Sequence, residues 1–246
     1  MSIAIRNCGS CFAFRGWFAG LCTLSLAIAA VLAPRTAVAQ QQPAAAGELR
    51  EYDVLVKQSP VGKVSIRTAE HPDGTVVATT DTTVNARFFL VTYHYEYHGT
   101  EVWQNERLVR LDSRADDDGK KLAVTAITDA RASRTDLPGG PPRSGPSLVM
   151  TSNYWRLPDQ RLTAGDFAII DSDTGTLFTV KIQRLGTDTI AVDGQNIACE
   201  HFRVSGDTSA ELWFDGKRRL IRQQTVEQGH LTEVRLVRIR AVAARQ

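Results

Sequence analysis

Turn signals recur at short intervals through most of this chain, and they constrain its fold more than any other feature. The runs between them are rich in Val, Thr, Ile, Tyr and Phe, which are enriched in β-strands. The signals are Ser59-Pro60-Val61-Gly62, Pro72-Asp73-Gly74, Asp117-Asp118-Gly119, Asp173-Thr174-Gly175, Asp193-Gly194, Asp215-Gly216 and Gln228-Gly229. Together they predict an all-β, antiparallel fold with hairpin connections and little helix.

Apolar and polar residues alternate within these runs, as they do in strands that have one buried face. The clearest apolar face consists of Phe89, Val91, Tyr93, Tyr95 and Tyr97. We expect a single antiparallel sheet wrapped around a core. With about eleven strands, such a sheet should curl rather than leave open edges, so we expect a strongly curved half-barrel or an irregular barrel. A β-sandwich is the second choice.

The amino terminus has the pattern of a cleavable export signal. Arg6 and Arg15 precede an apolar stretch over 17–33, and the small residues Ala37 and Ala39 suit a signal peptidase. We therefore expect a signal peptide over 1–39, cleavage before Gln40, and a periplasmic or secreted protein. A membrane anchor is the alternative. Residues 40–48 read as a short linker, and 49–243 as one β-rich domain.

Removal of this segment changes both the cysteine count and the net charge. Cys8, Cys11 and Cys22 would leave with it, so that Cys199 alone remains and no intrachain disulfide can form. Of 29 basic residues, three lie before position 40, and the remaining 26 face 27 acidic residues, a net charge of −1. Such a balance does not favour nucleic acid as a partner.

The longest interruption of the strand pattern is a Pro- and Gly-rich segment at 129–147. It contains Pro138, Pro141, Pro142 and Pro146 together with three glycines, which exclude a helix or a central strand. Segments of this length are usually lids or disordered loops. We expect a flap here, between two β-rich halves.

Several short motifs, taken together, resemble a family of exported bacterial proteins known as a domain of unknown function. They are Tyr52-Asp53-Val54-Leu55-Val56 with Pro60-Val61-Gly62, Glu101-Val102-Trp103 with Leu108-Val109, Asp116-Asp117-Asp118-Gly119, Asn153-Tyr154-Trp155, Asp171 to Gly175, Phe202-Arg203-Val204-Ser205-Gly206 and Leu212-Trp213-Phe214-Asp215. The resemblance implies an exported β-fold similar to the half-barrels of lipoprotein-carrier proteins, and it supplies no catalytic residues. The resemblance leads us to expect a small polar residue after Asn153-Tyr154-Trp155, but this sequence has Arg156 there.

A curled sheet with almost no helix to fill it can enclose a small ligand. We expect an apolar cavity covered by the 129–147 flap and occupied by a fatty acid, a phospholipid or another apolar molecule. Its lining is predicted to include Tyr93, Tyr95, Trp103, Trp155 and Trp213. Plain packing of these aromatic side chains in the core is the alternative.

The last thirty residues carry eight basic and two acidic side chains. If their strands pair, several arginines meet on one side and form a patch for an anionic headgroup, an anionic membrane surface or an acidic partner. The candidates are Arg219, Arg222, Arg235 and Arg238. The alternative is an ordinary solvated edge protected by charge.

A metal site is the most specific catalytic alternative. His94, Glu96 and His98 share one face of a predicted strand, and they are suitable ligands for zinc or copper. A solvated outer face opposite the tyrosine stripe explains the same pattern, and no fourth ligand is apparent. We expect no bound cofactor.

Other catalytic patterns are weak or missing from the sequence. It contains no G-x-S-x-G elbow, and the Asp171 segment lacks the Glu that would complete a calcium loop, since Ile182 stands there. Cys199 and His201 are spaced as a conceivable thiol–imidazole pair, but spacing alone does not orient a base. We therefore expect a non-enzymatic, exported ligand-binding protein. The rivals are an enzyme with a metal on its strand and a structural or interaction domain of the cell envelope.

Overall fold

A computed structural model describes residues 46–88, 91–137, 140–157, 165–227 and 230–243. The chain divides into two units, 1–40 and 41–246, and the second contains every described residue. The predicted signal peptide and its cleavage site lie outside the described residues, and so does the Gln228-Gly229 turn. Among the residues that are described, no helix has the length and apolar character needed to cross a membrane.

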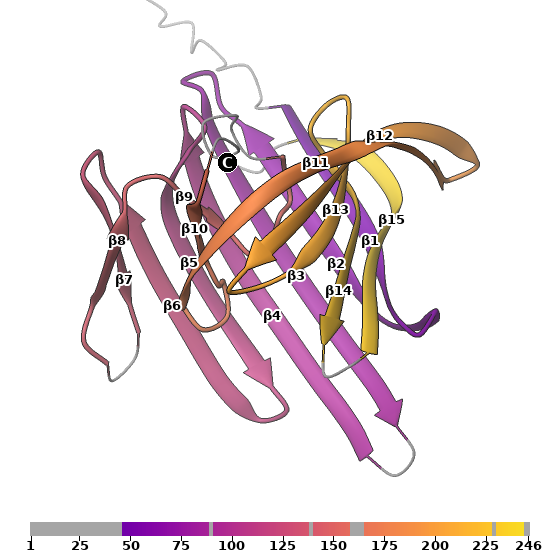
Figure 1. Cartoon of the computed structure of the whole chain (residues 1–246), viewed down its shortest axis with the longest axis horizontal. Coiled ribbons are helices and arrows are strands. Elements are labelled where there is room, and N and C mark those ends of the chain that lie inside the picture. The colour runs from indigo at the N-terminus through magenta and orange to yellow at the C-terminus, as the bar shows by residue number, and fades with distance from the viewer. Residues whose placement is uncertain (1–45, 89–90, 138–139, 158–164, 228–229, 244–246) are drawn as a thin grey trace, which may run out of the picture. The chain divides into compact units, whose positions relative to one another are not determined.

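The described residues form fifteen β-strands (Figure 1). Their bounds are β1 Ala46–Val56, β2 Ser59–Glu70, β3 Thr75–Phe88, β4 Val91–Gln104, β5 Arg107–Asp117, β6 Lys120–Thr128, β7 Ala132–Asp136, β8 Arg143–Pro146, β9 Val149–Thr151, β10 Phe167–Ile170, β11 Leu177–Val192, β12 Gln195–Gly206, β13 Ala210–Asp215, β14 Leu220–Glu227 and β15 His230–Ala243. All of them belong to one sheet. The predicted all-β class is confirmed.

The sheet curls into a nearly closed barrel, with β8 and β9 as its two edges (Figure 1). Strands β1 to β8 follow one another in order, and so do β9 to β15, while β1 pairs with β15 to join the two series. Neighbouring strands are antiparallel except for β9 and β10. Across the gap, Gly145 on β8 packs so closely against Leu177 on β11 that a β-carbon there would lie 2.7 Å from the leucine Cδ1. The expected strongly curved sheet is therefore confirmed.

Tight two-residue turns connect many of these strands. Asp118-Gly119 and Asp193-Gly194 have positive φ angles at both positions, as expected of the hairpin turn whose twist matches the strands. Lys57-Gln58 and Asn105-Glu106 adopt the same conformation without glycine. The predicted turn at 59–62 is wrong because Lys57-Gln58 makes this turn, and residues 59–62 begin β2.

The 129–147 segment is not the strand-free flap that we expected. It contributes β7 and β8, which extend the sheet edge beyond β6. The run Ala132–Asp136 contains neither Pro nor Gly and can pair with β6 along its length. Pro146 is tolerated because β8 is an edge strand, where a missing N–H donor need not break a ladder.

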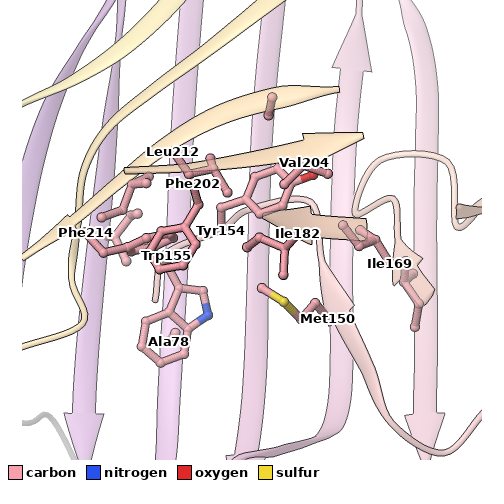
Figure 2. Close-up of a cluster of buried hydrophobic side chains, with 14 of the residues drawn as sticks. Ala78, Met150, Tyr154, Trp155, Ile169, Ile182, Phe202, Val204, Leu212 and Phe214 are labelled. Carbon is pink, nitrogen blue, oxygen red and sulfur yellow. The ribbon is translucent and has the colours of Figure 1, made fainter. Parts of the chain in front are cut away.

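Side chains fill much of the space inside the curled sheet. Figure 2 shows residues of β9 to β13 gathered around Tyr154 and Trp155 between the walls of the sheet. Leu212, Phe214 and Ile169 are fully buried in this cluster. The expected apolar cavity at the centre of the sheet is thus occupied by the protein's own side chains, because β13 and β10 direct large aliphatic and aromatic residues inward.

Candidate functional site

A buried carboxylate fixes the segment that follows β9. Glu101 on β4 is 1% exposed and accepts hydrogen bonds from four uncharged donors. The Nε1 atoms of Trp103 and Trp155 each donate to Oε2 at 2.8 Å, and Thr151 and Asn153 donate to Oε1 at 2.9 and 2.6 Å. Since three of these donors lie in 151–155, Glu101 holds that segment against β4.

The hydrogen bonds to Glu101 fix the position of Trp155. Two guanidinium groups flank this tryptophan. The Cζ atoms of Arg50 and Arg156 lie 5.9 and 5.3 Å from the centre of its ring, within cation–π range. Arg50 also donates to the Trp155 carbonyl oxygen at 2.8 Å. Trp103 meets Trp155 edge to face, with ring centres 6.1 Å apart. The result is a rigid aromatic base bordered by cations.

Above this base lies an open cleft of about 550 Å³, a volume typical of small-molecule sites. Its cationic lining residues are Arg50, Arg156, Lys217, Arg218 and Arg219, and its acidic ones are Glu48, Glu70 and Glu106. Val76, Trp103, Trp155 and Ala241 supply apolar surface. The lining thus has an excess of two positive charges.

The acidic residues already hold most of the cleft's cations. Glu106 forms ion pairs with Arg156 and Arg218, and Glu48 with Arg50 and Arg219. Burial lowers the pKa of Arg156, and Glu106 opposes this effect.

Lys217 differs from these arginines. It is exposed at the rim, and its ammonium group has no ion-pair partner among the residues that the structure describes. It is therefore available to an incoming anion.

Unusual backbone conformations concentrate around the cleft. Of eight non-glycine residues with positive φ among the described residues, Asn105, Glu106 and Arg218 line it. Tyr154, with φ of 46°, directly precedes Trp155. Such conformations are strained for most side chains and are over-represented at functional sites. The three lining residues lie in two turns that carry the Glu106–Arg218 ion pair.

The five aromatic residues predicted to line one cavity are separated in the structure. Trp103 and Trp155 line the cleft. Trp213 stacks between Arg222 and His201, and its Nε1 donates to Asp188 at 2.7 Å.

The tyrosine hydroxyls meet other partners. Tyr93 donates to Asp117 and Tyr95 to Asp173, at 2.8 and 2.7 Å. Burial, reinforced by the negative charge of Asp173, raises the pKa of Tyr95. These hydroxyls tie β4 to acidic residues of neighbouring segments, so the two tyrosines serve the fold.

The four predicted arginines also divide between two places. Arg219 lines the cleft and pairs with Asp215 and Glu48. Arg222 and Arg235 share Glu233, while Arg238 pairs with Glu51. The latter three lie along β14 and β15, away from Trp155.

The predicted metal ligands do not assemble. His94 lies 3.3 Å from Glu96, and its other ring nitrogen lies 2.7 Å from the Asn85 Oδ1 atom. His98 instead pairs with Asp81 at 2.6 Å. Among the described residues, no three His, Cys, Asp or Glu side chains form a group able to hold a metal ion.

The remaining weak motifs have structural explanations. Asp171 Oδ1 accepts the backbone N–H groups of Asp173 and Thr174, both at 2.9 Å, which makes this segment an Asx turn. Burial raises the pKa of the Cys199 thiol to about 11, which disfavours the thiolate form. His201 lies 2.5 Å from Glu211 and stacks on Trp213.

The site residues that sequence reasoning missed are Glu101, Arg50 and Lys217. Strand parity would have identified the first two. Glu101 shares the inward face of Tyr97 and Trp103, and Arg50 shares that of Tyr52. A charged residue on the inward face of a predicted strand would have marked both positions as candidate site residues. The sequence offers no comparable signal for Lys217. Its position in the cleft depends on the contact between the 215–218 turn and β1, which are far apart in the sequence.

Comparison with solved structures extends the fold assignment. The chain is similar to the crystal structure of a beta-barrel-like protein of domain of unknown function DUF1849 from Brucella abortus, with a TM-score of 0.61. The match covers 82% of this chain and all of the other, at 6% sequence identity, so it supports the fold alone.

No curated protein matches this chain. Residues 52–237 match a family that is described as a domain of unknown function, DUF6134. This span begins at the Tyr52 motif and ends in β15. It includes Glu101 and the turn at 215–218 that borders the cleft. The chain therefore belongs to the DUF6134 family.

Proposed function

We propose that this protein is an exported, non-enzymatic binding protein that takes an anionic amphiphile in the cleft above Trp155. The observation that carries the proposal is the ammonium of Lys217, which has no ion-pair partner among the described residues, at the rim of a cleft whose other lining cations are paired. A carboxylate or phosphate would meet Lys217 first and could then share the Arg156 and Arg218 guanidiniums with Glu106.

The apolar part of the ligand is expected to be small. Side chains fill much of the interior of the sheet, so a long acyl chain would find apolar surface mainly on Val76, Ala241 and the small accessible parts of the two indoles. A fatty acid with its carboxylate at Lys217 fits this division better than a bulky phospholipid. We therefore place the lipid-like ligand expected from the sequence in the cleft above Trp155 and not at the centre of the barrel.

A fluorescent fatty acid and its methyl ester test the proposal. The two probes share the apolar chain and differ in the charged group that Lys217 would bind. We expect the acid to bind with a dissociation constant at least about tenfold lower than the ester, since a charge-assisted hydrogen bond contributes about 1.5–3 kcal/mol. Fluorescence titration of the exported protein measures both.

The Lys217→Gln variant should remove this preference and leave ester binding unchanged. Lys120→Gln is the matched control, since Lys120 is also exposed but lies in the β5–β6 hairpin. Equal binding of acid and ester would overturn the assignment of the carboxylate to Lys217. Failure of both probes to bind would favour a structural or interaction domain of the envelope instead.

Export is part of the proposal and has its own test. Mass spectrometry of protein secreted by a suitable bacterial host should give a chain that begins at Gln40. A mature chain that still contains Trp17 would identify the segment as an anchor.

A further inference from the structure

Exposed large hydrophobic side chains concentrate on β14 and β15. Five large hydrophobic side chains are exposed among the described residues, and three of them are Val226, Leu231 and Val237. Val226 is 66% exposed and lies directly opposite Leu231 in the strand pairing, so both project from the same face near the hairpin tip.

Arginines occupy the same face. Arg222 lies four residues before Val226 on β14, and Arg235 lies four residues after Leu231 on β15, so strand alternation places all four on one side. Arg222 and Arg235 are direct cross-strand partners.

The register of the β1–β15 pairing shifts between Leu236 and Arg238, and this shift forms a bulge at Val237. It leaves Val237 exposed beside Arg238, which faces Glu51. Arg240 bonds the same carboxylate. We call Arg222, Val226, Leu231, Arg235, Val237, Arg238 and Arg240 the hairpin face.

The acidic groups on this face are either buried or paired with basic side chains. Glu233 is 1% exposed, because Arg222 and Arg235 cover it. Glu51 is shared between Arg238 and Arg240, each 49% exposed. Asp53, directly opposite Arg235, is paired with Lys63. Four guanidinium groups and Lys63 against Glu233, Glu51 and Asp53 leave an excess of two positive charges.

We propose that the hairpin face docks on an anionic membrane surface. The guanidiniums would bind lipid phosphates, for which their planar donor geometry is suited, while Val226 and Leu231 enter the interfacial region. This inference goes beyond the proposed function, since none of its residues lines the cleft.

The composition of the face favours a membrane over an acidic protein. Protein interfaces usually centre on an aromatic or arginine anchor seated in a pocket. Here the aromatic residue, Trp213, is 6% exposed and lies between Arg222 and His201. What projects outward is aliphatic at the tip and cationic behind it, as in peripheral membrane anchors.

Co-sedimentation of the full exported protein with vesicles tests the proposal. The probes are vesicles of phosphatidylcholine alone and of phosphatidylcholine mixed with phosphatidylglycerol. We expect binding to the mixed vesicles that weakens as NaCl is added. The Arg238→Gln/Arg240→Gln variant should bind roughly 10- to 30-fold more weakly, because each arginine near an anionic surface contributes about a factor of five.

Removing the apolar tip provides a second, independent variant. Val226→Ser/Leu231→Ser keeps every charge and should weaken binding to the mixed vesicles several-fold. The matched controls are Arg110→Gln/Arg134→Gln and Ile127→Ser, which change side chains of comparable exposure on β5, β7 and β6. Both should bind like the wild-type protein.

Three outcomes would overturn the proposal. They are equal binding to both kinds of vesicle, equal losses in the control variants, and binding to polyglutamate without binding to either vesicle. The last would assign the face to an acidic polypeptide. Circular dichroism confirms that each variant remains folded, and fatty acid titration of the same variants shows whether the cleft is unaffected.

Discussion

Two glutamates in this protein are equally inaccessible to solvent, and yet their surroundings are opposite. Glu101 and Glu233 are each 1% exposed. Glu101 faces the interior from β4 and accepts hydrogen bonds from uncharged donors. Glu233 faces outward from β15 and accepts them from Arg222, Arg235 and Gln224.

The difference reverses the effect of burial on proton binding. Burial raises the pKa of Glu101, and its four hydrogen bonds do not compensate. Burial would raise the pKa of Glu233 too, but the hydrogen bonds from Gln224, Arg222 and Arg235 and the positive charge of Arg222 outweigh it, so this pKa is lowered. Glu101 lies deep in the interior, where desolvation prevails, whereas Glu233 lies just beneath the arginines, where hydrogen bonds and positive charge together prevail.

The comparison separates two uses of a buried carboxylate. Neutral donors offset only part of the cost of burying the charge of Glu101, but they fix four side chains in one geometry beside the cleft. Cationic donors compensate Glu233 and stabilise an outer surface, where water also reaches the arginines. Glu101 thus fixes side chains beside the cleft, and Glu233 holds two arginines of the hairpin face.

Removing Glu101 should have the largest effect. In Glu101→Ala, four donors lose their acceptor, and a cavity remains where the carboxylate stood. We expect a loss of about 4 kcal/mol or more in the free energy of unfolding, since each buried, unpaired donor costs about 1–3 kcal/mol. Urea denaturation measures it. The control Glu96→Ala, on the exposed face of the same strand, should change stability by less than about 0.5 kcal/mol.

Removing Glu233 should cost less. We expect Glu233→Ala to lose about 2–3 kcal/mol, toward the low end for a broken buried pair, because Arg222 and Arg235 are partly exposed and can be rehydrated. The same denaturation experiment applies, with Glu200→Ala as control, since Glu200 is half-exposed and pairs with Arg184. A loss equal to that of Glu101→Ala would mean that donor charge does not distinguish the two sites.

Deleting one neutral donor from each site sharpens the comparison. Trp103→Phe removes one of four donors to Glu101 and should cost about 2 kcal/mol, whereas Gln224→Ala leaves both arginines on Glu233 and should cost less than about 1 kcal/mol. Chemical denaturation of the two variants side by side checks this order. The reverse order would contradict the assigned roles.

The smallest effect is a difference in pH dependence. The ordinary pKa of a glutamate is near 4.5. Relative to Glu101→Gln, the wild-type protein should lose stability as the pH rises from 4.5 to the raised pKa of Glu101, because folding favours its protonated form. Relative to Glu233→Gln, it should lose stability as the pH falls from 4.5 through the lowered pKa of Glu233. Thermal unfolding from pH 3 to 8 checks that the two slopes have opposite signs.

Much of the fold was predictable because turns and strands are local. Asp118-Gly119 and Asp193-Gly194 marked hairpins correctly, since glycine readily adopts a positive φ. Asn105-Glu106 was not predicted, because its turn is imposed by the pairing of β4 with β5 on either side. The strands β7 and β8 were missed for a similar reason, since prolines nearby concealed a short run that can pair at an edge.

The candidate site was less predictable, because it combines residues from distant segments. Trp103 and Trp155 line the cleft, but they were chosen as candidates on aromatic character alone, which also selected Trp213. The cleft requires the 215–218 turn to meet the beginning of β1, and no local pattern encodes that meeting.

The pairing of β1 with β15 has a consequence for how this chain reaches its fold. The two sheet edges, β8 and β9, are consecutive in sequence, while the ends of the domain, Ala46 and Ala243, lie opposite each other in the ladder. A circular permutant opened between β8 and β9 and joined at those ends would present its strands in unbroken sequential order. Its most distant pairing would become a hairpin, and its contact order would fall. In the natural chain the closing strand is synthesised last, so the two halves must wait for β15 before the barrel can form.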